Sequence, residues 1–223
     1  MTCYSWLEQA RDINPSEQVL GSLARALALD EAETAHLFRL AGHRPPIREQ
    51  RGGADLSAAY RMLLDQLDPC PAMVTNHRFD VLAWNRGHTA VFGDFARYEG
   101  DRRNMLWYTF LEPEARRLVV DWAEQAAFVV GLFRSQASEL LATEPFTRLV
   151  RTLAAESAEF AELWERRDLV SFTPTAQALQ HPTAGRIELH PVKLYAVQQD
   201  RTVVAYLAEP GSPTHRRLTE AIG

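Results

Sequence analysis

The sequence predicts an α+β protein that is mostly helical. Three observations lead to this prediction: apolar residues at helical spacing over the first 42 residues, two short strand-like runs after residue 70, and strand patterns rich in valine and aromatic residues after residue 170. A long helical stretch, roughly residues 87–167, separates the two groups of strands. We therefore expect a sheet that is assembled from both ends of one domain's sequence, with a long helical insert.

The first 42 residues have the pattern of three helices. Residues 3–9 contain the start of an apolar stripe, and Ser16 and Asp30 stand where N-caps of two further helices would lie. The inner face of the second helix would hold Val19, Leu20, Leu23, Ala24 and Leu27. That of the third would hold Ala35, Leu37, Phe38 and Leu40, with Gly42 just past its end.

The remaining elements follow in order. Prolines and glycines in a charged stretch predict a linker over residues 43–55, and a helix over 56–67 follows it. The runs Ala72–Thr75 and Phe79–Trp84 predict a hairpin. Helices should begin near Pro113, with no break before residue 143, and near Pro145, and Ser212 should cap a C-terminal helix.

Composition excludes several classes of protein. The chain has 223 residues with a net charge of −5, no apolar run long enough to span a membrane, and no signal peptide, so we expect a cytoplasmic protein. Cys3 and Cys70 fit no disulfide or metal-binding pattern. Nucleophile, phosphate-loop and dinucleotide-binding motifs are absent, and the seven histidines lack ligand spacing. The sequence thus predicts no enzyme, no metal and no cofactor. The dipeptides His181-Pro182 and His190-Pro191 are expected at strand ends.

The second domain is rich in large aromatic residues. Most should fill its core, but some could line an apolar pocket that also contains a few polar groups. From residue type alone, the candidate ligand-binding residues are Trp84, Asn85, Phe92, Trp107, Phe110, Arg116, Trp122, Phe128, His190 and Tyr195.

Two groups of motifs resemble known families. The segment "YSWLEQARDINPSEQVLGSLARALALDEAETAHLFRLAG" resembles the second half of the helix-turn-helix domain of XRE-type bacterial repressors. Farther on, "PAMVTNHRFDVLAWN", "HPTAGRIELH" and "LAEPGSP" resemble landmarks of the MmyB-like ligand-binding domain that usually follows this helix-turn-helix. The resemblance implies a truncated helix-turn-helix over residues 1–42, which begins at the recognition helix, a linker over 43–55, and a PAS-like sensor domain over 56–223.

This resemblance also implies a function. The expected protein is a cytoplasmic, homodimeric transcription regulator that senses a fatty-acid-like or other small apolar ligand. Residues 2–9 would form the recognition helix, which lies in the major groove of DNA in that family. Its base-facing residues would be Thr2, Ser5, Trp6 and Gln9, and Arg11 would contact phosphate.

The chain departs from the family at its N-terminus. In the family, two further helices come before the residues that this sequence matches, and this sequence lacks them. In addition, Ala10 stands where the family usually has glycine. Residues 1–52 contain six arginines and seven acidic residues, a net charge of −1, so we expect impaired DNA binding. Either the start of the sequence is misassigned or trimmed, or the protein is a sensor and dimerisation partner that acts through full-length relatives.

Overall fold

The computed structural model describes residues 15–42, 56–136, 140, 143–173, 175–196 and 201–223. It separates into two compact units, residues 1–52 and 53–223. The predicted recognition helix, with Thr2, Ser5, Trp6, Gln9 and Arg11, and the predicted linker over 43–55 lie outside the described residues.

Two helices form the described part of the first unit: α2 (Glu17–Ala26) and α3 (Glu31–Leu40). Asp30 caps α3 as predicted, because its carboxylate accepts from the Glu33 N–H at 2.8 Å and the Glu33 side chain accepts from the Asp30 N–H at 2.9 Å. Gly42 follows with φ of 74°.

The inner faces predicted for these helices are correct only in part. Leu20 and Phe38 are buried, but Leu27 and Leu40 are 52% and 72% exposed. Both lie at the C-terminal ends of their helices, at the C-cap of α2 and the last position of α3. Their helical spacing predicted burial, but at the helix ends these side chains are exposed.

In the described part of the second unit, the strands form one antiparallel sheet with the order β2-β1-β5-β4-β3. The strands are β1 (Ala72–Thr75), β2 (Val81–Trp84), β3 (Gln177–His181), β4 (Gly185–Ala196) and β5 (Arg201–Leu207). β1 pairs with β5, so the sheet is assembled from both ends of the domain's sequence, as predicted. The predicted hairpin is also present, although β2 begins at Val81 because Phe79 has a φ of +65°.

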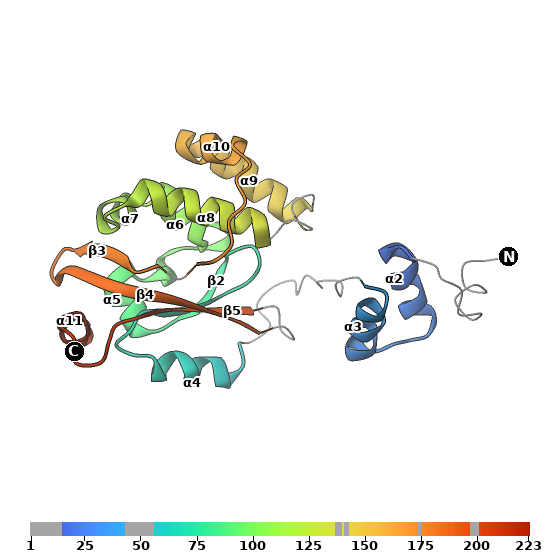
Figure 1. Cartoon of the computed structure of the whole chain (residues 1–223), viewed down its shortest axis with the longest axis horizontal. Helices are drawn as coiled ribbons and strands as arrows, with labels where there is room; N and C mark the ends of the chain where they lie inside the picture. The colour runs from blue at the N-terminus through green and yellow to red at the C-terminus, as the bar shows by residue number, and fades with distance from the viewer. Residues whose placement is uncertain (1–14, 43–55, 137–139, 141–142, 174, 197–200) are drawn as a thin grey trace. The chain divides into compact units, whose positions relative to one another are not determined.

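Helices cover both faces of the sheet, and Figure 1 shows α4 (Ala58–Gln66) on the opposite side from α8 (Trp122–Gln136). On the α4 side, Leu64 packs against Val74 and Val203. α9 (Glu144–Glu156) and α10 (Ala158–Glu165) lie beyond α8 in the same figure and enclose Phe133, Phe146 and Phe160 with it. The other helices are α5 (Arg86–Phe92), α6 (Met105–Leu111), α7 (Pro113–Leu118) and α11 (Pro213–Ile222), with short 3-10 helices at Phe95–Arg97 and Gly100–Arg102.

The helical stretch after Pro113 is not continuous, contrary to the prediction. α7 ends at Leu118, and Val119 forms an isolated bridge with Leu179 of β3. The Val120 N–H donates to the carbonyl of Ala178 at 3.1 Å. Pairing with the edge of the sheet therefore interrupts the helix after Leu118, although no proline follows before residue 143. The sequence near Leu118 does not predict this pairing, because the partner residues lie about sixty positions farther along the chain.

The strand-end prediction is correct for one histidine and wrong for the other. His181 is the last residue of β3 and its ring accepts from the backbone N–H of Ala184. His190 lies within β4, opposite Leu207, and is exposed. Proline follows it inside the strand, and the ladder continues across that position.

Asn85 joins three elements at one point. Its Oδ1 accepts from the backbone N–H groups of Ala72 and His88, both at 2.9 Å. Its Nδ2 donates to the carbonyls of Leu64 at 3.1 Å and Cys70 at 2.9 Å. The side chain is buried, so these four bonds hold α4, β1 and the start of α5 together in a place that water does not reach.

We expect Asn85→Ala to lower the free energy of unfolding by about 2 to 4 kcal/mol, because it leaves buried donors and acceptors without partners. Urea unfolding of the whole chain measures this loss. The control is Asp94→Ala, which removes an exposed cap on the Ala96 N–H and should cost about 1 kcal/mol or less. Equal losses in the two variants would contradict this role for Asn85.

Candidate ligand-binding site

A cavity of about 280 Å³ lies between the sheet and α8. Its lining comes from three directions: α8, the sheet, and the segment that leads into β3, which includes Phe172 and Ala176. Apolar side chains form the larger part of its walls, and polar and charged side chains lie among them. This combination is characteristic of sites that enclose small molecules.

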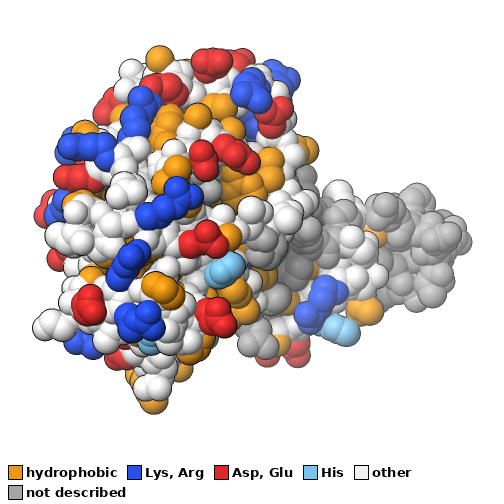
Figure 2. Space-filling model, turned by 60° about the vertical axis from the view of Figure 1, so that its left-hand side comes forward, with side chains coloured by type: hydrophobic (Ala, Val, Ile, Leu, Met, Phe, Trp, Pro, Cys, Tyr) orange, Lys and Arg blue, Asp and Glu red, His pale blue; other side chains and the backbone are white. Residues whose placement is uncertain are grey.

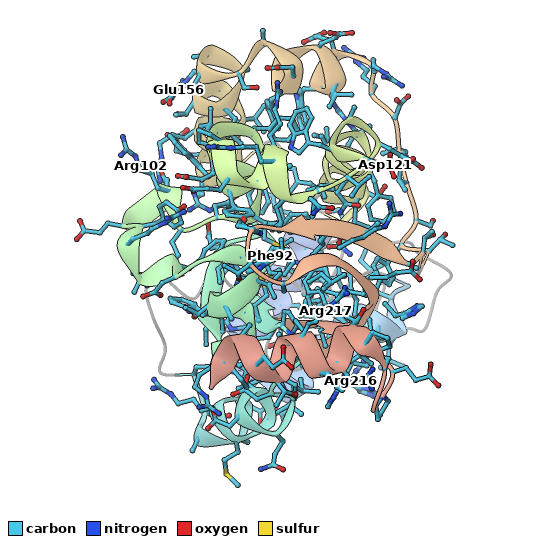
Figure 3. The ribbon with its side chains drawn as sticks, turned by 90° about the vertical axis from the view of Figure 1, so that its left-hand side faces the viewer. Phe92, Arg102, Asp121, Glu156, Arg216 and Arg217 are labelled. Carbon is cyan, nitrogen blue, oxygen red and sulfur yellow. The ribbon has the colours of Figure 1, made fainter. Side chains whose placement is uncertain are left out.

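One face of α8 and the residue before it line the cavity along most of the helix. The lining residues recur at helical spacing: Asp121, Glu124, Gln125, Phe128, Val129 and Leu132. At the rise of an α-helix this stripe is about 16 Å long. Its middle is apolar, and Asp121 and Glu124 are exposed at one end. Figure 3 shows Asp121 at the edge of the domain, whereas Phe92 lies near its middle.

The sheet side of the cavity is built from alternate residues of neighbouring strands. Val204 of β5 lies opposite Met73 of β1 and also opposite Lys193 of β4. Residues that are paired in this way share a face of the sheet. Two positions farther along, Tyr206 and Pro191 form another such pair, and both line the cavity.

A smaller cavity of about 50 Å³ adjoins the first. The two share the lining residues Met105, Val119, Gln125, Val129, Gln177 and Tyr206. His88 lines the smaller cavity and is fully buried against the rings of Phe92 and Phe95. Burial lowers the pKa of His88 to about 3, so its imidazole is neutral near pH 7.

Lys193 is the only basic residue among the described residues that line the larger cavity. Its ammonium donates to Gln136 Oε1 at 3.2 Å and lies 5.4 Å and 5.6 Å from the ring centres of Phe79 and Phe172. Within the described part of the chain it forms no ion pair. Burial therefore lowers the pKa of Lys193 to about 8.

Phe79 connects the hairpin with this cavity. It has a φ of +65°, which is unfavourable for a residue with a Cβ, and its ring is buried against Phe133 of α8. An ion-paired turn holds this conformation: Arg78 bonds Asp80 at 2.8 Å and Asp101 at 2.7 Å. The turn thereby places an aromatic ring beside Lys193.

Three of the residues proposed from sequence line a cavity. Phe128 lines the larger one, and Phe92 and Trp122 line the smaller one. Their contact with a ligand remains a prediction.

The other seven proposed residues lie outside both cavities. Asn85 is committed to backbone groups, as described above. Trp84, Trp107 and Phe110 pack within the apolar clusters. Arg116 lies over the Trp122 ring at 4.0 Å and pairs with Glu159 at 2.5 Å, whereas His190 and Tyr195 are exposed.

The sequence-based selection missed the polar residues that do line the larger cavity, among them Lys193, Gln125 and Tyr206. A signal for Lys193 was present, because it is the only lysine in the chain and stands in a strand-like run. Alternation along β4 and β5 would also have placed Lys193 and Tyr206 on faces of those strands. Their convergence depends on strand pairing, which the sequence pattern alone does not provide.

Among the described residues, no group of three or more His, Cys, Asp or Glu side chains is arranged to hold a metal ion. None of the described helices has the length and apolar character needed to cross a membrane.

The structure is that of an α+β domain with a cavity of the kind that encloses small molecules. Residues 56–221 match the family model of the MmyB-like transcription regulator ligand binding domain, and the chain belongs to this family. No curated protein shows significant similarity to the chain. The match spans every strand of the sheet and both cavities.

The lowered pKa of Lys193 makes the stability of the domain depend on pH. Lysine in the unfolded chain has a pKa near 10.5, against about 8 in the fold, so the unfolded state binds more protons between these values. The free energy of unfolding should therefore rise with pH in this range, relative to a variant without the amine.

We expect Lys193→Met to be more stable than the wild-type chain by about 2 to 3 kcal/mol near pH 7, because it removes a desolvated charge. This advantage should shrink as the pH rises from about 8 toward 10.5. Urea unfolding of ligand-free protein across that range measures it. Parallel pH profiles for the two proteins would show that Lys193 is not desolvated as described.

Proposed function

We propose that the protein is a transcription regulator that senses a small apolar ligand through a PAS-like domain of residues 56–223. The observation that carries the proposal is the cavity beneath α8, which lies within the segment that matches a regulator's ligand-binding domain. A single antiparallel sheet interrupted by a long helical insert supports the PAS-like assignment.

The proposed ligand is fatty-acid-like. The cavity follows α8 for about 16 Å, which suits a linear molecule better than a compact one. Phe128, Val129 and Leu132 make the middle of this path apolar. Each methylene of an alkyl chain that is buried there would contribute about 0.8 kcal/mol to binding.

We expect the purified chain to retain or take up a long-chain fatty acid in native mass spectrometry, and Leu132→Trp to abolish this by filling the cavity. The matched control is Ala123→Trp, which adds the same side chain at an exposed position of α8 outside the lining. Both variants should unfold cooperatively. Equal uptake by Leu132→Trp and wild-type protein would place the ligand elsewhere.

For the N-terminal unit we propose the second half of a helix-turn-helix, in which α2 and α3 follow the recognition helix. Residues 2–9 would enter the major groove, with Thr2, Ser5, Trp6 and Gln9 toward the bases and Arg11 toward phosphate. A homodimer would match a symmetric DNA site. A ligand would regulate binding only if it favours one of two arrangements of the protein.

Charge favours a second function, in which the chain is a sensor and dimerisation partner of full-length relatives. Residues 1–52 have a net charge of −1, and attraction to phosphate contributes much of the affinity of proteins for DNA. On the face of the molecule drawn in Figure 2, acidic and basic side chains are interspersed, so this face offers no basic surface in compensation.

Selection from a random duplex library at about 0.15 M salt separates the two functions. Because of the charge balance, we expect this chain alone to enrich no sequence. Enrichment of a palindromic site would instead support a regulator that is competent by itself. Co-expression with a relative that has a complete helix-turn-helix provides the control, since the second function requires a mixed dimer that binds DNA.

A further inference from the structure

The charged groups of the larger cavity are separated along its length. Lys193 contacts Gln136, the last residue of α8, whereas Asp121 and Glu124 lie at the start of that helix. From residue 124 to residue 136 the helix rises about 18 Å. The one cation and the two carboxylates therefore lie toward opposite ends of a space whose other described walls are uncharged near pH 7.

The charge of Lys193 is only partly compensated in the fold. Its described polar contact is a neutral amide oxygen, and the two aromatic rings at 5.4 Å and 5.6 Å offer weak cation–π attraction. Buried cations in proteins are usually paired with an anion. Lys193 lines the cavity, so an anion inside the cavity could reach the ammonium.

We propose that Lys193 forms an ion pair with the head group of a monoanionic amphiphile, a carboxylate whose alkyl chain lies along α8. The inference rests on the proposed function, because it assumes that the cavity holds a ligand. One lysine neutralises one charge, whereas a phosphate monoester carries nearly two near pH 7. Asp121 and Glu124 repel an anion at the other end and so favour this single orientation.

The aromatic neighbours of Lys193 are suited to this role. Phe79 and Phe172 place apolar rings beside the ammonium, and an apolar environment strengthens an ion pair with an incoming carboxylate. Gln136 can keep its bond to one ammonium hydrogen while the others remain for the ligand. A neutral molecule of the same shape would leave the charge as poorly compensated as it is in the free protein.

Calorimetric titration of the delipidated chain with laurate and with dodecanol, which share one alkyl chain, tests the inference. We expect the wild-type protein to bind laurate about tenfold to a hundredfold more tightly than dodecanol near pH 7. Lys193→Met should bind the two with equal affinity, since methionine keeps the apolar stem but not the charge. Equal affinities in the wild-type protein would overturn the role of Lys193 and leave the apolar site standing.

The outcome in which neither probe binds has a different meaning. Absence of both laurate and dodecanol binding would contradict the proposed function, and with it this inference. Preference for laurate that persists in Lys193→Met would retain the fatty-acid site but overturn its assignment to Lys193.

The pH profile provides a readout that a merely structural lysine would not change. The affinity of the wild-type chain for laurate should fall as the pH rises above about 8, because the Lys193 ammonium of the ligand-free protein loses its proton there. Lys193→Arg should keep its affinity across this range, because arginine stays charged. Asp121, Glu124 and Tyr206, the other ionisable groups that line the cavity, are unchanged in both proteins. Parallel profiles would overturn the inference.

Discussion

The pairing of β1 with β5 is the constraint on which the rest of the second unit depends. Residues 72–75 pair with residues 202–205, which are far away in the sequence of the domain. This pairing makes β5 a central strand with both faces buried. It sorts the side chains as well: Val74 and Val203 face α4, whereas Met73 and Val204 face the helical insert. The cavity exists because the second of these faces is only partly covered.

The cover on that face is incomplete for a structural reason. α8 is held near its start by the bridge between Val119 and β3, and at its far end by the hydrogen bond that the Lys193 ammonium donates to Gln136 Oε1. Its outer residues instead meet α9 and α10, where Phe133 packs against Phe146. Gly131 allows the segment after α10 to lie close to α8, since a Cβ at Gly131 would be only 2.6 Å from a methyl carbon of Val170. α8 is thus held at its ends and along its outer side, and the cavity lies between it and the sheet.

Local signals predicted much of the fold and little of the site. Caps such as Asp30 and Ser212, the hairpin, and the strands after residue 176 depend on nearby residues and could be predicted from sequence. The break after Leu118 and the cavity depend on contacts with β3 and between distant strands. Aromatic content was a weak guide for the same reason: residues such as Trp107 and Phe110 pack among the helices, while an isolated lysine lies in the cavity.

The same lysine links stability with ligand recognition. A charge that is desolvated in the free protein weakens the fold, and an anion that pairs with it would remove that cost only in the complex. Ligand binding then stabilises the domain through mass action, beyond what burial of an alkyl chain supplies. Because Gln136 ends α8 and contacts Lys193 directly, the first element to sense the head group would be the C-terminal end of that helix. A regulator that must respond to an amphiphile, and not to any apolar molecule, needs a discriminating contact of this kind, and apolar walls alone cannot provide it.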